Sequence, residues 1–320
     1  MAQTNLLLPG GYVGPGALTY PSAYSPNGAV IYVLSTTGAD NRGRLAGLGG
    51  PSGPYGNPAA PLATVFGTNG ALSYCSANRG DLVVVLQGHT ETISGIVTVP
   101  AGVTVIGLGY GSSRPTISLG TTTTNTVTLN AGSRVQNCIF TGIGVDAIVS
   151  MFTTGGAGAQ LVQNRIVMAD GTNQALAGIT VAHADCLISG NTIDSPNAGA
   201  AYAVVPSAAV ARLRMEGNTI RGNFSVAVIG STSTNHVTDM VIQGNNFVQR
   251  NGTAKVIFDF TTSSTGLVSN NVLNGTTWAT AADAIANSSS TSLRWFQNYG
   301  FDDGAGVVSG ILVPAAGTLA

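Results

Sequence analysis

The segment Leu187-Ile-Ser-Gly-Asn-Thr-Ile193 returns 27 residues later as Arg214-Met-Glu-Gly-Asn-Thr-Ile220, and then as Val241-Ile-Gln-Gly-Asn-Asn-Phe247. A related segment, Gln160-Leu-Val-Gln-Asn-Arg-Ile166, precedes them by the same interval. Around each asparagine, apolar residues recur at every second position, as in strands whose side chains alternate between two faces. A fixed repeat of this length is typical of a solenoid, in which each repeat forms one turn stacked on the previous one.

The asparagine at the centre of the repeat recurs along most of the chain. It is placed at Asn137, Asn164, Asn191, Asn218, Asn245, Asn270 and Asn298, with steps of 27, 27, 27, 27, 25 and 28 residues. Asparagine and glycine tolerate the left-handed backbone of a tight bend. Strands of successive turns lie about 4.8 Å apart, so stacked asparagines would exchange amide hydrogen bonds. The seven residues are therefore predicted to form a structural ladder.

Each repeat also contains a third apolar stretch, which predicts about three short strands per turn. These stretches are residues 147–152, 178–181, 202–205, 225–229 and 256–260. The chain ends lack the period. We therefore divide the chain into an extended N-terminal arm (1–27), a lead-in segment with a capping helix (28–80), a parallel β-helix (81–300) and a C-terminal tail (301–320).

The N-terminal part of the repeat region carries a resemblance to a known family. Asn57-Pro-Ala-Ala-Pro-Leu-Ala-Thr-Val-Phe66 leads into a short helix expected to run through Arg79, and Gly80-Asp-Leu-Val-Val-Val-Leu-Gln-Gly88 forms the first rung. Val99-Pro-Ala-Gly-Val-Thr-Val-Ile-Gly-Leu-Gly109 forms the second rung. With the asparagine repeat, residues 28–300 resemble the right-handed parallel β-helix of pectate-lyase-like proteins. The resemblance implies an all-β, single-stranded β-helix with three strands per turn.

The composition favours a subunit of an assembly. The chain has 44 glycines, and only 8% of its residues are charged, against about 25% in typical globular domains. The net charge of −1 without a basic run disfavours nucleic acid as a partner. No apolar stretch reaches membrane-spanning length, and the N-terminus lacks the pattern of a secretory signal. The three cysteines, Cys75, Cys138 and Cys186, are expected to be reduced thiols.

The acidic residues give little support to catalysis. Glycoside hydrolysis needs two carboxyl groups close together, and Asp259 and Asp283 come nearest to this because they lie about one turn apart. They are kept as weak carbohydrate-site candidates. His89 beside Glu91 suggests acid–base chemistry, but a structural turn is the favoured interpretation. No catalytic residue, metal ligand or cofactor is predicted, and the chain is expected not to be an enzyme.

One column of charges aligns between turns: Asp185, Arg212 and Asp239. A sugar or metal site is one interpretation. A ladder of alternating charges that fixes the register of the turns is the favoured one.

Two functions of different class remain. The Gly/Pro-rich arm, the low charge and the motif from Gly80 to Gly102 resemble phage-encoded short β-helix proteins. That resemblance implies a capsid decoration or cement protein on the virion exterior, assembled in the host cytoplasm as a homotrimer. Its partners would be the major capsid protein and sister subunits, with outward residues such as Leu187 and Val241 at the contacts. The alternative is a tailspike-type polysaccharide lyase or hydrolase, or a carbohydrate-binding adhesin, acting on host surface polysaccharide.

Overall fold

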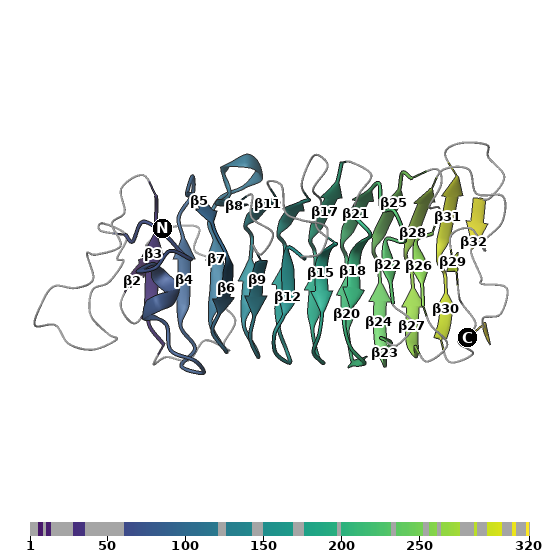
Figure 1. Cartoon of the computed structure of the whole chain (residues 1–320), viewed down its shortest axis with the longest axis horizontal. Helices are drawn as coiled ribbons and strands as arrows, with labels where there is room; N and C mark the ends of the chain where they lie inside the picture. Colours follow the sequence, from purple (N-terminus) through teal and green to yellow (C-terminus); the bar gives the residue numbers. More distant parts are fainter. Residues whose placement is uncertain are drawn as a thin grey trace, which may run out of the picture.

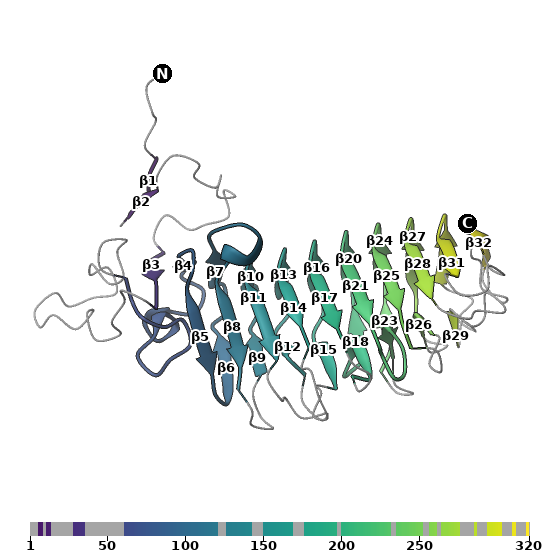
Figure 2. The ribbon, with the colours of Figure 1, turned by 90° about the horizontal axis from the view of Figure 1, so that it is seen from above.

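The fold is an all-β rod of stacked turns. A computed structural model of the 320-residue chain describes residues 6–8, 11–13, 28–35, 61–120, 126–142, 150–168, 176–196, 200–231, 235–251, 256–260, 264–275, 285–286, 293–302, 309–311 and 318–319. Figure 1 shows the turns following one another along the long axis, from the N-terminal to the C-terminal end. The view from above in Figure 2 shows the same order.

Three sheets run along the rod, and successive turns of the solenoid add their strands to them in sequence order. Sheet I has eleven strands: β3 (Val30–Val33), β4 (Leu82–Val85), β7 (Thr104–Gly107), β10 (Arg134–Gln136), β13 (Gln160–Val162), β16 (Leu187–Ser189), β20 (Arg214–Glu216), β24 (Met240–Gln243), β27 (Gly266–Ser269), β30 (Leu293–Phe296) and β33 (Thr318–Leu319).

Sheet II has ten strands: β5 (Thr90–Ile93), β8 (Thr116–Leu119), β11 (Ile139–Gly142), β14 (Arg165–Val167), β17 (Thr192–Ser195), β21 (Thr219–Gly222), β25 (Asn246–Gln249), β28 (Val272–Gly275), β31 (Tyr299–Asp302) and β32 (Ser309–Ile311). Sheet III has eight: β6 (Ile96–Val99), β9 (Thr126–Leu129), β12 (Phe152–Thr154), β15 (Ala177–Val181), β18 (Tyr202–Pro206), β22 (Ile229–Gly230), β26 (Phe258–Asp259) and β29 (Ile285–Ala286). Two short strands, β19 (Val210–Ala211) and β23 (Val237–Thr238), pair in parallel beside them.

The core consists of inward-facing side chains stacked in columns. In sheet I, Ile188 is in register with Met215 and Ile242 of the following turns, and all three are buried. Aromatic rings join the sheets across the interior. Phe247 of sheet II meets Phe258 of sheet III edge to face, with ring centroids 5.1 Å apart. Every turn therefore buries its apolar face against its neighbours, as the repeat predicts.

The predicted capping helix is smaller than expected. Among its described residues, the lead-in segment contains a single 3-10 turn, η1 (Ala71–Tyr74), which ends in extended backbone at Cys75. Backbone hydrogen bonds from Ala71 to Thr64 and from Leu72 to Val65 hold η1 against the preceding segment. A second 3-10 turn, η2 (Gly111–Ser113), follows β7. The solenoid also begins earlier than residue 81, because β3 already pairs with β4 in parallel.

Both predicted tails contain strands. Within the N-terminal arm, β1 (Leu6–Leu8) and β2 (Gly11–Val13) form an antiparallel hairpin. At the other end, β32 pairs antiparallel with β31, and β33 adds in parallel to β30. Strands of the C-terminal tail therefore continue two of the sheets beyond residue 300.

Candidate functional site

The asparagine ladder is present, but two of its predicted members lie elsewhere. Its residues are Asn164, Asn191, Asn218, Asn245, Asn271 and Asn298, all buried. In each successive pair, the side-chain Nδ2 of one residue donates to Oδ1 of the next, at 2.8–3.3 Å. At the first rung, the backbone N–H of Cys138 donates to Oδ1 of Asn164 at 3.0 Å.

Asn137 and Asn270 were wrongly placed in the ladder, since each lies one residue before it. They occupy the adjacent bend position, where backbone φ is +57° and +55°. Gly190, Gly217 and Gly244 hold the same position in the turns between them, also with positive φ. This position needs a left-handed backbone, which explains why asparagine and glycine are interchangeable there.

Three buried side chains, Asp81, His89 and Glu91, bind backbone groups at the N-terminal end of the solenoid, and we call them the clasp. Asp81 forms its first half. Its carboxylate is fully buried and accepts hydrogen bonds from the backbone N–H groups of Ala29 and Ser76, both at 2.7 Å. The Arg79 guanidinium donates to both carboxylate oxygens, at 2.6 and 2.7 Å, and these bonds raise the pKa of Arg79. Asp81 therefore joins the lead-in segment to β3.

His89 and Glu91 form the second half of this clasp. The backbone N–H of Ser35 donates to Nδ1 of His89 at 3.0 Å, so Nε2 carries the ring hydrogen and faces Oε2 of Glu91 at 3.2 Å. Glu91 also accepts from the backbone N–H groups of Val65 and Phe66 at 2.8 and 2.9 Å. Both side chains are nearly or fully buried. The geometry supports the structural interpretation of this pair.

The predicted charge column lies on the exposed bend before sheet I. Arg212 donates from Nε and Nη2 to the two carboxylate oxygens of Asp185, at 2.5 and 2.8 Å. Hydrogen bonding by Arg212 lowers the pKa of the Asp185 carboxyl. The structure shows no hydrogen bond or ion pair from Arg212 to Asp239, which lies in the next turn. All three residues have positive φ. Arg212 is therefore hydrogen-bonded on one side only, and the Asp239 charge acts on it without a direct contact.

Sequence analysis missed a second charged column, on the outer face of sheet II. Asp194 of β17 is in register with Arg221 of β21 and forms a two-point ion pair with it. Arg165 of β14 approaches the same carboxylate at 3.8 Å. Asp194 and Arg221 each lie three residues after a ladder asparagine, and this common offset was the available signal.

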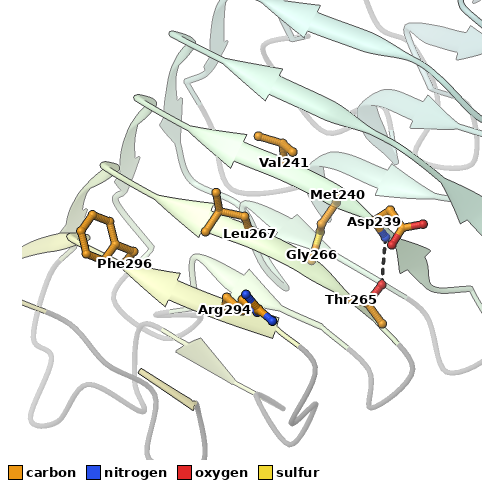
Figure 3. A pocket seen from close by; sticks show the side chains of 8 residues that line it. All are labelled: Asp239, Met240, Val241, Thr265, Gly266, Leu267, Arg294 and Phe296. Atoms are coloured by element: carbon orange, nitrogen blue, oxygen red, sulfur yellow. Dashed lines mark hydrogen bonds between the residues drawn. The ribbon is translucent and has the colours of Figure 1, made fainter. Parts of the chain in front are cut away.

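A shallow depression of about 530 Å³ lies on the outer face of sheet I near the C-terminal end. Its lining residues come from three neighbouring turns: Asp239, Met240, Val241, Thr265, Gly266, Leu267, Arg294 and Phe296. Figure 3 shows Phe296 and Asp239 at opposite sides, with Leu267 between them. The backbone N–H of Asp239 donates to Oγ1 of Thr265 at 2.8 Å. Charged groups thus border a floor that is mostly apolar.

Gly266 forms part of that floor and cannot be replaced without movement. Its φ is +130°, and a Cβ at this position would lie 2.1 Å from the Met240 carbonyl oxygen. In the same column, Met240 and Leu293 place side chains in the core. Glycine between them lets the backbone of β27 lie close against that of β24.

Exposed aromatic residues gather around the last described turn. Phe296, Tyr299 and Phe301 have exposed fractions of 44%, 43% and 48%. Phe296 ends β30, and Tyr299 begins β31 after the bend at Gln297 and Asn298. We call these three residues the aromatic corner. In preceding turns, Thr219, Asn246 and then the exposed Val272 occupy the column of Tyr299, so the corner continues an apolar surface that begins one turn earlier.

Of the two carbohydrate-site candidates, only Asp259 lies within the described residues. Asp259 of β26 is in register with Ala286 of β29. Asp283 precedes Ala286 by three residues and lies outside the described residues. Asp259 instead has an aromatic neighbour. The ring of Tyr202 lies close over Gly230, the register partner of Asp259, and burial together with the Asp259 charge raises the pKa of Tyr202.

The described residues contain no group of three or more histidine, cysteine, aspartate or glutamate side chains arranged to hold a metal ion. Cys75, Cys138 and Cys186 are free thiols, and burial raises the pKa of both Cys75 and Cys138 to about 12. Such thiols are poor nucleophiles because little thiolate forms at neutral pH. Among the helices that the structure describes, none is long and apolar enough to cross a membrane.

Comparisons with family models, with curated proteins and with solved structures found no match to this chain. The parallel β-solenoid is therefore assigned from the coordinates alone.

Proposed function

We propose that this protein is a non-enzymatic structural component of a tailed-bacteriophage virion, a decoration or cement protein on the exterior of the capsid. In this role the solenoid is a stiff post, assembled in the host cytoplasm. Its partners are the major capsid protein and sister copies, in the homotrimer that the resemblance implies. The exposed aromatic corner and the charged groups that hold the fold together support this proposal.

The aromatic corner is the observation that carries the proposal. Three rings are about half exposed at one end of a rod, where the column of Tyr299 changes from the polar Thr219 and Asn246 to the exposed Val272 and then to the tyrosine ring. Clustered exposed apolar residues mark surfaces that other molecules cover. Aromatic residues are also enriched at the energetic centres of protein interfaces. A rod that ends in such a cluster is suited to attachment at that end.

The charged groups of the clasp support a scaffold role. Asp81 and Glu91 use their oxygens to hold backbone N–H groups, and Asp185 and Asp194 pair with arginines of the next turn. Burial or pairing of this kind is how a carboxylate contributes to a fold. These side chains maintain the register of the rod, which a post on a capsid requires.

The test is binding to particles that lack this protein. A variant with Tyr299→Ser and Phe301→Ser should lose most of its occupancy on such particles, while its circular dichroism stays that of the wild type. The control is Ile96→Ser, because Ile96 is 66% exposed on β6 in the first turns and lies away from the corner. Full occupancy of the double variant would contradict attachment through the aromatic corner.

A second function, carbohydrate binding or cleavage by a tailspike-type β-helix, is favoured by one observation. Tyr202 and Asp259 lie together on the outer face of sheet III, and an aromatic ring beside a carboxylate suits a sugar ring with its hydroxyl groups. Purified protein would then release reducing or unsaturated ends from host surface polysaccharide, and Asp259→Asn would abolish the release. No release by the wild type would remove the enzymatic version of this candidate.

A further inference from the structure

The depression on sheet I has a charge arrangement that the proposed function does not use. Its acidic residue, Asp239, and its basic residue, Arg294, come from turns on either side of β27. Arg212 is bound to Asp185 and not to Asp239. Within the part of the chain that the structure describes, the Arg294 guanidinium has no hydrogen bond or ion pair, and the Asp239 carboxylate has no hydrogen bond. Two exposed opposite charges thus lack a contacting partner.

The two charges lie too far apart to pair within one chain. Asp239 precedes β24 and Arg294 lies in β30, with β27 between them in the sheet. Neighbouring strands are separated by about 4.8 Å, so the two residues differ by about 10 Å along the rod. Arg294 shares its column with Val241 and Leu267, and Asp239 lies two residues back along the strand from that column. Leu267, a partly exposed apolar side chain of the middle strand, lies at a height between the two charges. The order along the rod is therefore acidic, apolar and basic.

We propose that the depression binds the same depression of a second copy of this chain, running antiparallel, about a two-fold axis that crosses β27 at right angles to the line from Asp239 to Arg294. Such an axis exchanges the positions of these two residues, which differ in height along the rod and by two residues along the strand. It therefore places Asp239 of each copy opposite Arg294 of the other, with Leu267 close to its own counterpart. This is the self-complementary arrangement of an isologous interface. The inference goes beyond the proposed virion role and does not depend on it.

A side-by-side arrangement about an axis parallel to the rod does not satisfy these charges. It keeps every residue at its own height, so Asp239 and Arg294 of adjacent copies would remain about 10 Å apart along the rod. The antiparallel pair is thus a contact different from the expected trimer. The patch spans only a few strands, which places it at the small end of specific interfaces. Association is expected to be weak, concentration-dependent and reduced by salt.

The test is sedimentation over a concentration series, with Asp239→Arg and Arg294→Asp. Each single variant places like charges together at both contacts and should be monomeric where the wild type dimerises. A mixture of the two variants should form dimers, because each contact then joins opposite charges. The double variant should dimerise for the same reason. Arg250→Asp, an exposed residue outside the depression, is the matched control and should dimerise like the wild type.

At about 0.5 mM even weak specific contacts are populated. A wild-type protein that stays monomeric at this concentration would overturn the proposal. The depression would then be a site for another protein or a saccharide. Single variants that dimerise normally would also overturn it. So would a mixture that stays monomeric while each variant melts like the wild type. Phe296 belongs to both the depression and the aromatic corner. The particle-binding experiment changes only Tyr299 and Phe301, so its outcome and that of the sedimentation experiment can differ.

Discussion

Asn191 donates twice to Oδ1 of Asn218, from its backbone N–H at 2.9 Å and from its side-chain Nδ2 at 3.1 Å. Asn218 repeats the same pair of bonds with Asn245, and its Nδ2 also donates back to the Ile188 carbonyl at 2.8 Å. Each amide therefore satisfies backbone groups of the turns on both sides. Since buried polar groups are costly when unpaired, the ladder couples the stability of one turn to the next.

Replacing Asn218 by alanine should lower the free energy of unfolding by about 3 kcal/mol or more, because several buried groups of Asn191, Ile188 and Asn245 lose their partner together. The urea midpoint measures this. Asn246→Ala is the control, because Asn246 follows the ladder residue but is exposed on β25, and surface substitutions typically change stability by less than about 0.5 kcal/mol. Equal losses in the two variants would argue against the ladder.

Gly217 tests the bend beside the ladder. Its φ is +63°, and a Cβ there would meet nothing within 4 Å, so any cost arises from the backbone alone. Gly217→Ala should cost about 1 kcal/mol. Gly217→Asn should cost less, because Asn137 and Asn270 already hold this position with positive φ. Thermal melting of the two variants compares them directly, and a more stable alanine variant would contradict the assigned conformation.

Glu91 tests the clasp, and Glu216, the other glutamate of the chain, is its control. Glu91→Gln should destabilise by about 2 kcal/mol, because an amide offers one acceptor oxygen where the carboxylate accepts from Val65, Phe66 and His89. Glu216→Gln should have little effect, since Glu216 pairs with Arg214 at an exposed site. Chemical denaturation measures both. Equal stability of the two variants would show that Glu91 does not hold the lead-in segment.

The Asp185–Arg212 pair predicts a pH-dependent effect. Hydrogen bonding to Arg212 holds the pKa of Asp185 below its ordinary value. The stabilisation is therefore complete above the unfolded pKa of about 4 and is lost as pH falls through the folded pKa. Arg212→Ala should melt slightly below the wild type at pH 7, and the difference should shrink on acidification. A difference that grows in acid would oppose this assignment. Asp239→Asn, in the same column but without that bond, should change the melting temperature less.

The sequence predicted the solenoid because the 27-residue repeat survives in almost every turn. The error at Asn270 arose because two asparagines are adjacent there, and only the second, Asn271, is buried in the ladder. A one-residue slip exchanges the faces of a strand. A ladder through Asn270 would turn Val272 inward, whereas Leu273 is the buried residue and Val272 is exposed. Steps of 26 and 27 residues, in place of 25 and 28, would have identified Asn271.

The depression and the aromatic corner were beyond sequence analysis for a different reason. Arg294 and Asp239 are far apart in the chain and occupy different columns, so no repeat position relates them. The role of Gly266 depends on the close approach of the Met240 carbonyl, which requires coordinates. The strands β32 and β33 likewise follow no repeat, since they join the sheets from a segment whose composition indicates a tail.

The central claim, a structural post attached to a capsid, is tested most directly by locating the protein on purified particles of the virus that encodes it. Cryo-electron microscopy of the particles should show β-solenoid density on the capsid exterior, at regular positions of the lattice and with the aromatic corner in contact with a neighbouring subunit. Density for the solenoid only at the tail, or intact particles that contain none of the protein, would contradict the account.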